Sequence, residues 1–140
     1  MKEEIVRQWI KKAKSDLKVV KNLINSKDPP IDMLCFHCQQ AVEKYLKAFL
    51  TWTDVRVKKT HDLEAILNLC IEKSEGFEEV DKDKISNLAL YAVEIRYPED
   101  TLNPSIQDAK DFYKFSRTIE DFVLKKLEEL GLSFETNSNQ

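Results

Sequence analysis

Three groups of polar residues in this 140-residue chain have types and spacings suited to binding an anion or moving a proton. The first is Arg96, which lies four residues after Ala92 and eight after Leu88, on the apolar side of a predicted helix. An unpaired guanidinium there would be costly. Arg96 therefore requires either a carboxylate, such as Glu99 or Asp100, or a ligand phosphate that matches its planar donors. The sequence leaves both the structural and the ligand-binding role open.

The second group surrounds the expected N-terminus of a helix and consists of Lys58, Lys59 and His61. Free backbone amides and the helix dipole favour an anion at this place, so the group is a candidate phosphate cradle. Thr60 is the predicted N-cap, and Asp62 suits the positive end of the dipole. The alternative is a solvated basic loop in which Thr60 only caps the helix.

The third group, Gln40, Lys44 and Lys47, falls on one side of another predicted helix. Two amines and an amide are thereby placed together. Three interpretations stay open: a solvated polar face, a subunit interface, or a basic groove that contacts a ligand.

A metal site is not expected. The segment Cys35-Phe-His37-Cys38 resembles half of a zinc site, but the second ligand pair is missing and the spacing fits a helix, in which cysteines pack as small hydrophobic residues. The sequence contains no P-loop, dinucleotide-binding, metalloprotease or nucleophile-elbow motif, and no cofactor is predicted.

The elements that must position these residues are five amphipathic helices, identified by apolar residues at three- and four-residue steps. The run Leu88–Val93 is apolar nearly all round, so the helix that contains it is expected to lie in the core and to end at Arg96 or Tyr97, before Pro98. Residues 1–131 are expected to form one domain, and 132–140 a flexible tail. The five predicted helices span Glu3–Asn25, Ile31–Trp52, Thr60–Ser74, Lys82–Arg96 and Asn103–Leu130.

Composition supports an all-α protein. The chain has 42% hydrophobic and 34% charged residues but only 2 Gly, which suits long helices. A net charge of −3 gives no global attraction to polyphosphate, so DNA is not an expected partner. The charged N-terminus and the lack of a long apolar stretch predict a cytoplasmic protein without a membrane span.

Four blocks of this sequence together resemble the HEPN domain family, over about residues 5 to 128. They are the region of Trp9, Ala13 and Asp16-Leu17, the segment Phe36–Ala48, Thr60-His-Asp-Leu63, and Arg96-Tyr97-Pro98. The resemblance implies an up-and-down bundle of four to five helices that pairs as a homodimer. It also implies a nucleotide-binding role and a minimal nucleotidyltransferase partner, in a toxin–antitoxin pair.

Many HEPN proteins are metal-independent ribonucleases with an Arg that is followed, after four to six residues, by a His. Arg96 matches this Arg, but the sequence has no His beyond His61. A general acid or base is thus missing from the expected place. The resemblance then predicts a non-catalytic binding module, in which Arg96 and Tyr97, together with Lys44 and His61, hold a nucleotide, an RNA or an acidic segment of a partner. The alternatives are a ribonuclease in which His61 or Tyr97 replaces the missing His, and a purely structural subunit.

Overall fold

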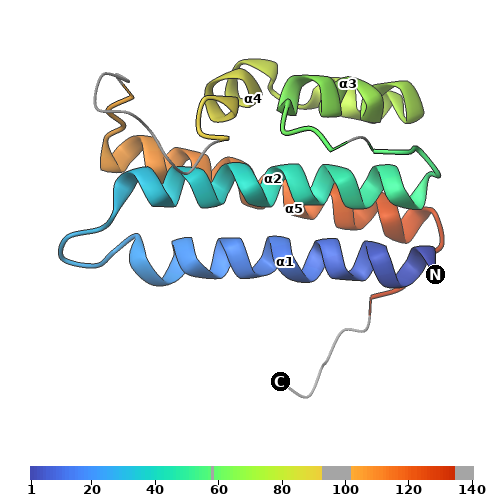
Figure 1. Cartoon of the computed structure of the whole chain (residues 1–140), viewed down its shortest axis with the longest axis horizontal. Helices are drawn as coiled ribbons and strands as arrows, with labels where there is room; N and C mark the ends of the chain where they lie inside the picture. Colours follow the sequence, from blue (N-terminus) through green and yellow to red (C-terminus); the bar gives the residue numbers. More distant parts are fainter. Residues whose placement is uncertain (58, 93–101, 135–140) are drawn as a thin grey trace.

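The computed structural model describes residues 1–57, 59–92 and 102–134 (Figure 1). This part of the chain forms five α-helices and one 3-10 helix and contains no strand, which confirms the predicted all-α bundle. The elements are α1 (Lys2–Leu23), α2 (Ile31–Trp52), α3 (Leu63–Lys73), η1 (Glu75–Glu79), α4 (Lys82–Ala89) and α5 (Ile106–Glu129).

Helix α2 is the centre of the bundle, because 13 of its 22 residues are buried. It packs against α1 and α5, while α3 and α4 lie along its other side (Figure 1). Two contacts show that α5 runs in the same direction as α2: the Ser116 hydroxyl donates to the Cys38 carbonyl, and the Trp52 indole donates to the Leu130 carbonyl. The segment from α3 to α4 therefore returns the chain to its starting end.

The predicted fourth helix is too long. Helix α4 ends at Ala89, and the next backbone hydrogen bonds join Tyr91 to Leu88 and Ala92 to Ala89, one residue closer than in an α-helix. Leu90 is 55% exposed, so the apolar run is not buried on every side as expected. An uninterrupted apolar run has no helical periodicity. It therefore indicates that the segment contacts the core, but it does not show at which residue the helix ends.

Two predicted N-caps are displaced by two residues. Asp62, not Thr60, caps α3 by accepting a hydrogen bond from the Ala65 amide, and the Thr60 hydroxyl instead accepts from the Asp62 amide. Ser105, not Asn103, caps α5 in a reciprocal capping box with Asp108. In both places several residues of capping type are adjacent, and the sequence alone does not choose among them.

The packed part of the chain continues past the end of α5. Gly131 has φ of +98°, a conformation that favours glycine, and it turns the chain so that Leu132 is buried. The Arg7 guanidinium then donates to the Ser133 carbonyl and lies 5.6 Å from the centre of the Phe134 ring. None of the described helices is both long and apolar enough to cross a membrane.

Candidate binding face on helix α2

The first polar cluster joins α1 to α2 through one carboxylate. Asp16 of α1 is 8% exposed and accepts from two side chains of α2. The Lys44 ammonium lies 2.6 Å from one of its oxygens, and Nδ1 of His37 lies 2.9 Å from the other. Lys44 is therefore neutralised inside the protein, and His37 is held in one orientation.

The second polar cluster lies along α2 at four-residue steps. Gln39, Glu43 and Lys47 are only 0%, 3% and 5% exposed. The Gln39 amide donates to one oxygen of Glu43 at 3.1 Å, and the Lys47 ammonium donates to the other at 2.9 Å. The Gln40 side-chain amide donates to Oε1 of Gln39 at 2.6 Å, and the centre of the Trp9 ring lies 5.5 Å from the Lys47 ammonium.

These contacts contradict the interpretation of Gln40, Lys44 and Lys47 as a solvated face. Lys47 is buried and Lys44 is largely covered, with a side-chain exposure of 19%. Burying an ammonium without a partner would be very costly, and each lysine has a carboxylate within 3 Å. Both lysines therefore act in the fold as halves of ion pairs.

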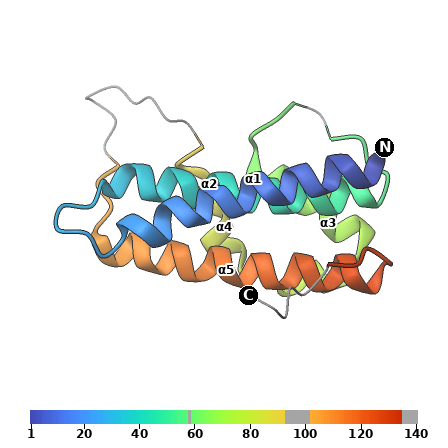
Figure 2. The same ribbon diagram turned by 90° about the horizontal axis from the view of Figure 1, so that it is seen from below.

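His61 connects this cluster to solvent. Its side chain is 68% exposed, yet its Nδ1 lies 3.0 and 3.2 Å from the two oxygens of Glu43. Because a carboxylate only accepts, Nδ1 carries the proton, which leaves Nε2 free to contact a ligand. Residues 53–57, which follow α2, and residues 59–62, which lead into α3, lie on the side of α2 away from α5 (Figure 2).

The predicted phosphate cradle at the start of α3 is occupied by the protein itself. The Asp62 carboxylate accepts from the Ala65 amide, so a negative charge already sits at the end of the helix. Lys59 is exposed nearby, and Lys58 lies outside the described residues. His61 thus belongs to the α2 cluster and not to an anion site at this helix terminus.

The structure brings four of seven predicted ligand-binding residues to one face of α2; the seven are Gln40, Lys44, Lys47, His61, Arg96, Tyr97 and Asp100. Lys47 and His61 meet at Glu43, Gln40 joins them through Gln39, and Lys44 is in the adjoining cluster. The other three, Arg96, Tyr97 and Asp100, lie outside the described residues. Sequence reasoning missed the buried acids, Asp16 and Glu43, that organise this face, although the four-residue steps from Gln39 to Lys47 were a readable signal.

A separate buried polar group joins α2 to α5. The Tyr45 hydroxyl donates to Glu120, whose oxygens also lie 2.8 Å from Arg117 and 3.5 Å from Lys14. Burial and the hydrogen bond to Glu120 raise the pKa of Tyr45. Tyr45 therefore stays protonated and acts as a donor within the core.

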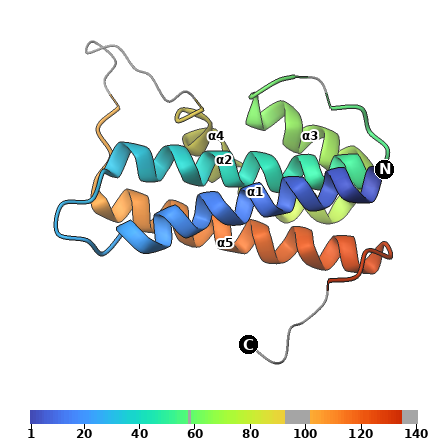
Figure 3. The ribbon, with the colours of Figure 1, turned by 60° about the horizontal axis from the view of Figure 1, so that its bottom comes forward.

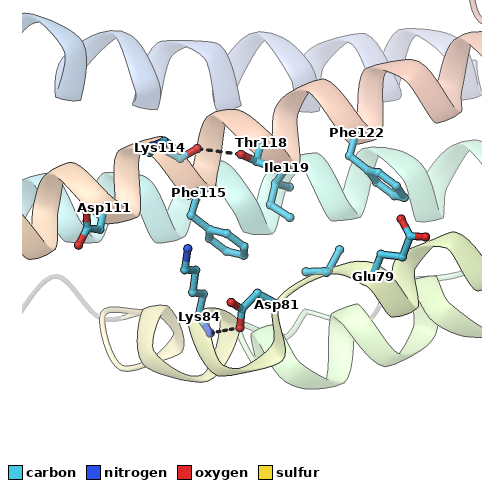
Figure 4. Close-up of a pocket in the computed structure, with 10 residues that line it drawn as sticks. Glu79, Asp81, Lys84, Asp111, Lys114, Phe115, Thr118, Ile119 and Phe122 are labelled. Carbon is cyan, nitrogen blue, oxygen red and sulfur yellow. Dashed lines mark hydrogen bonds between the residues drawn. The ribbon is translucent and has the colours of Figure 1, made fainter.

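A hollow of about 550 Å³ lies between α5 and the segment of η1 and α4 (Figure 4). Phe115, Ile119 and Phe122 form its apolar floor. Its rim carries both acidic and basic side chains, among them Asp81 and Lys84. It shares no residue with the polar clusters of α2, so it adds nothing to the candidate binding face.

The three cysteines are unpaired and buried. Burial raises the pKa of Cys35 and of Cys38 to about 12 and raises that of Cys70 as well. Within the described residues, no group of three or more His, Cys, Asp or Glu is arranged to hold a metal ion. The thiols therefore pack as apolar groups and remain protonated at neutral pH.

This burial predicts a loss of stability at alkaline pH. Thiols of the unfolded chain ionise from about pH 9, whereas Cys35 and Cys38 ionise in the folded protein near pH 12. As the pH rises through this range, the free energy of unfolding should thus decrease, by up to about 1.4 kcal/mol per pH unit for each thiol. Urea unfolding at several pH values should show a shallower decline for Cys35→Ala/Cys38→Ala than for the wild type. Parallel declines would contradict the prediction.

Comparison with known proteins agrees with this architecture. The HEPN domain profile matches residues 6–127. The crystal structure of TT1696 from Thermus thermophilus is similar in fold, with a TM-score of 0.66 and 24% sequence identity over 86% of this chain and 97% of that chain. No curated protein gives a significant match. Because the profile spans most of the chain, including α2 and nearly all of α5, this protein belongs to the HEPN domain family.

Proposed function

We propose that this protein is a non-catalytic HEPN module that binds a nucleotide or an RNA. The observation that carries the proposal is the fixed polar network of α2, in which Asp16 and Glu43 neutralise Lys44 and Lys47. The network holds the exposed His61 ring in one orientation through Nδ1, and neither of these two lysines is free to act as a nucleophile or base. The sequence after Arg96 also lacks the His of the ribonuclease motif.

In this proposal Arg96 supplies the main contact to a ligand phosphate. A guanidinium binds phosphate through two parallel hydrogen bonds, and the hydroxyl of Tyr97 adds a single contact. Nε2 of His61 carries no proton when Nδ1 does, so it accepts a hydrogen bond from a ribose hydroxyl or a base amine of the ligand. Membership of the HEPN family supports a homodimer and a minimal nucleotidyltransferase as the protein partner. The exposed but oriented ring of His61 favours binding over a purely structural role.

A metal-independent ribonuclease of a toxin–antitoxin pair is the second candidate, and one observation favours it. Nδ1 of His61 is held by the buried Glu43, and this is how a histidine is fixed for general acid–base catalysis. In that mechanism Nε2 of His61 would take the proton of the 2′-hydroxyl as its oxygen attacks the adjacent phosphorus, and Arg96 would stabilise the phosphorane-like charge. The bond from phosphorus to the 5′-oxygen would break to give a 2′,3′-cyclic phosphate, and the leaving 5′-oxygen would take a proton from water. The two candidates differ in whether bound RNA is cut.

Arg96→Ala is expected to weaken nucleotide binding about 10- to 100-fold, because a charge-assisted contact to phosphate contributes about 1.5–3 kcal/mol. Titration of purified wild type and variant with AMP, ATP and a short RNA, with the size of each protein determined by light scattering, measures the effect. Lys59→Ala is the matched control, since it removes an exposed cation near His61. Equal affinity of all three proteins, or no binding by the wild type, would refute the proposal.

A further inference from the structure

Helix α1 carries a stripe of basic residues along its whole length. Five cations follow one another at steps of four, three, four and three residues, which places them on one face. Helix α1 has seven basic and three acidic residues, an excess of four positive charges, in a chain whose net charge is −3. The basic stripe consists of Arg7, Lys11, Lys14, Lys18 and Lys21.

The basic stripe borders two hollows, and each contains an aromatic side chain. One hollow, of about 310 Å³, lies between α1 and α5 and includes Tyr113 and Arg117. The other, of about 360 Å³, lies on α1 against Phe134. Lys14 and Lys18 line both, so the hollows adjoin. Figures 2 and 3 show α1 and α5 side by side along this face.

The charge of the basic stripe is only partly cancelled locally, by Glu3 at 3.2 Å from Arg7 and by Glu120 at 3.5 Å from Lys14. Lys11, Lys18 and Lys21 are exposed and form no ion pair with any residue that the structure describes. Lys14 shares the single carboxylate of Glu120 with Arg117. Exposed like charges in a row destabilise a helix, so this arrangement costs stability unless an anion occupies the face.

We propose that the basic stripe and the two hollows form a second binding surface, for the backbone of a single-stranded RNA. A linear series of cations matches a chain of phosphates, and aromatic rings beside such a groove give bases a surface on which to stack. Tyr113 and Phe134 occupy these positions, one in each hollow. The inference rests on the RNA-binding form of the proposed function and adds a site separate from α2. An acidic protein would match the charges but would gain nothing specific from the two rings.

Fluorescence anisotropy with a labelled oligouridine of about 12 nucleotides tests the surface, at about 50 to 200 mM KCl. Lys11→Gln/Lys18→Gln should bind the RNA about tenfold more weakly than the wild type. The slope of log K against log[KCl] should also be smaller in magnitude by about 1.4, because two phosphate contacts are lost. Lys73→Gln/Lys82→Gln makes the same change of charge on α3 and α4, which do not pack against α1, and should bind like the wild type.

Equal binding by the two variants, or no binding by the wild type, would overturn the inference. So would displacement of the RNA by polyglutamate at equal charge concentration, since that would assign the basic stripe to an acidic protein. Tyr113→Leu should also weaken binding while leaving the salt dependence unchanged, because it removes a stacking surface and no charge. Stripe-dependent RNA binding by a protein that binds no AMP would uphold this surface and refute the proposed contact of Arg96 with a nucleotide phosphate.

Discussion

Glu43→Ala is expected to lower the free energy of unfolding by about 3–5 kcal/mol, the cost of leaving one member of a buried ion pair without its partner. Glu43 is 3% exposed and binds Lys47, Gln39 and His61. Its removal leaves the Lys47 ammonium and the Gln39 amide buried without an acceptor. Urea denaturation monitored by circular dichroism, which reports the helices, measures the loss.

A second variant separates the ion pair from packing. Glu43→Leu/Lys47→Leu replaces both charges with apolar groups and is expected to recover most of the lost stability, since an apolar pair often equals a buried salt bridge. Only the Gln39 amide then stays without its acceptor. It should nevertheless free His61, because the acceptor of Nδ1 is gone. A double variant as unstable as Glu43→Ala would show that the loss is not due to the unpaired charge.

Phe49→Ala is expected to lower the free energy of unfolding by about 3–5 kcal/mol, which is a large part of the total stability of a small domain. Phe49 is 1% exposed, and its ring centre lies 4.5 Å from that of Phe77, which in turn lies 4.9 Å from that of Phe122. This row of rings joins α2, η1 and α5, so its loss leaves a cavity at the point where three elements meet. The thermal midpoint should fall by more than about 10 °C on the scale typical of domains of this size.

Phe36→Ala is the matched control for that prediction. Phe36 is on the same helix, but it is only half-buried and contacts the edge of the His37 ring. We expect it to cost less than half as much as Phe49→Ala, because a partly exposed ring loses less apolar burial. Similar losses for the two variants would show that the aromatic row has no special role in the fold.

The long helices follow from the sequence because their apolar residues repeat at helical spacing over many turns. Helix α2 begins and ends at the predicted residues, Ile31 and Trp52, since Pro30 precedes it and its apolar face is wide. The end of α4 does not follow, because the choice between a helix and a turn after Ala89 depends on tertiary contacts, such as that of Tyr91 with Phe112. Helices with a strong apolar periodicity are therefore predicted correctly from the sequence, whereas the end of α4, where this periodicity is lost, is not.

The candidate face is harder to predict from the sequence. Spacing places Gln40, Lys44 and Lys47 on one side of α2, and this is correct. Their burial depends on what covers that side, which a single helix does not reveal. Asp16 lies 28 residues from Lys44, and His61 lies 18 residues from Glu43. Such pairs become visible only when the packing of α1 and of the segment before α3 is known.

An RNA cleavage assay tests the central claim, binding without catalysis, most directly. A short RNA with a fluorescent label at its 5′ end is incubated without metal with an excess of wild type, Arg96→Ala or His61→Ala, and bound and cut RNA are measured in the same samples. We predict that the wild type binds the RNA and leaves it intact, and that Arg96→Ala binds it more weakly. Cleavage that is lost in both Arg96→Ala and His61→Ala would contradict the claim and identify the protein as a ribonuclease.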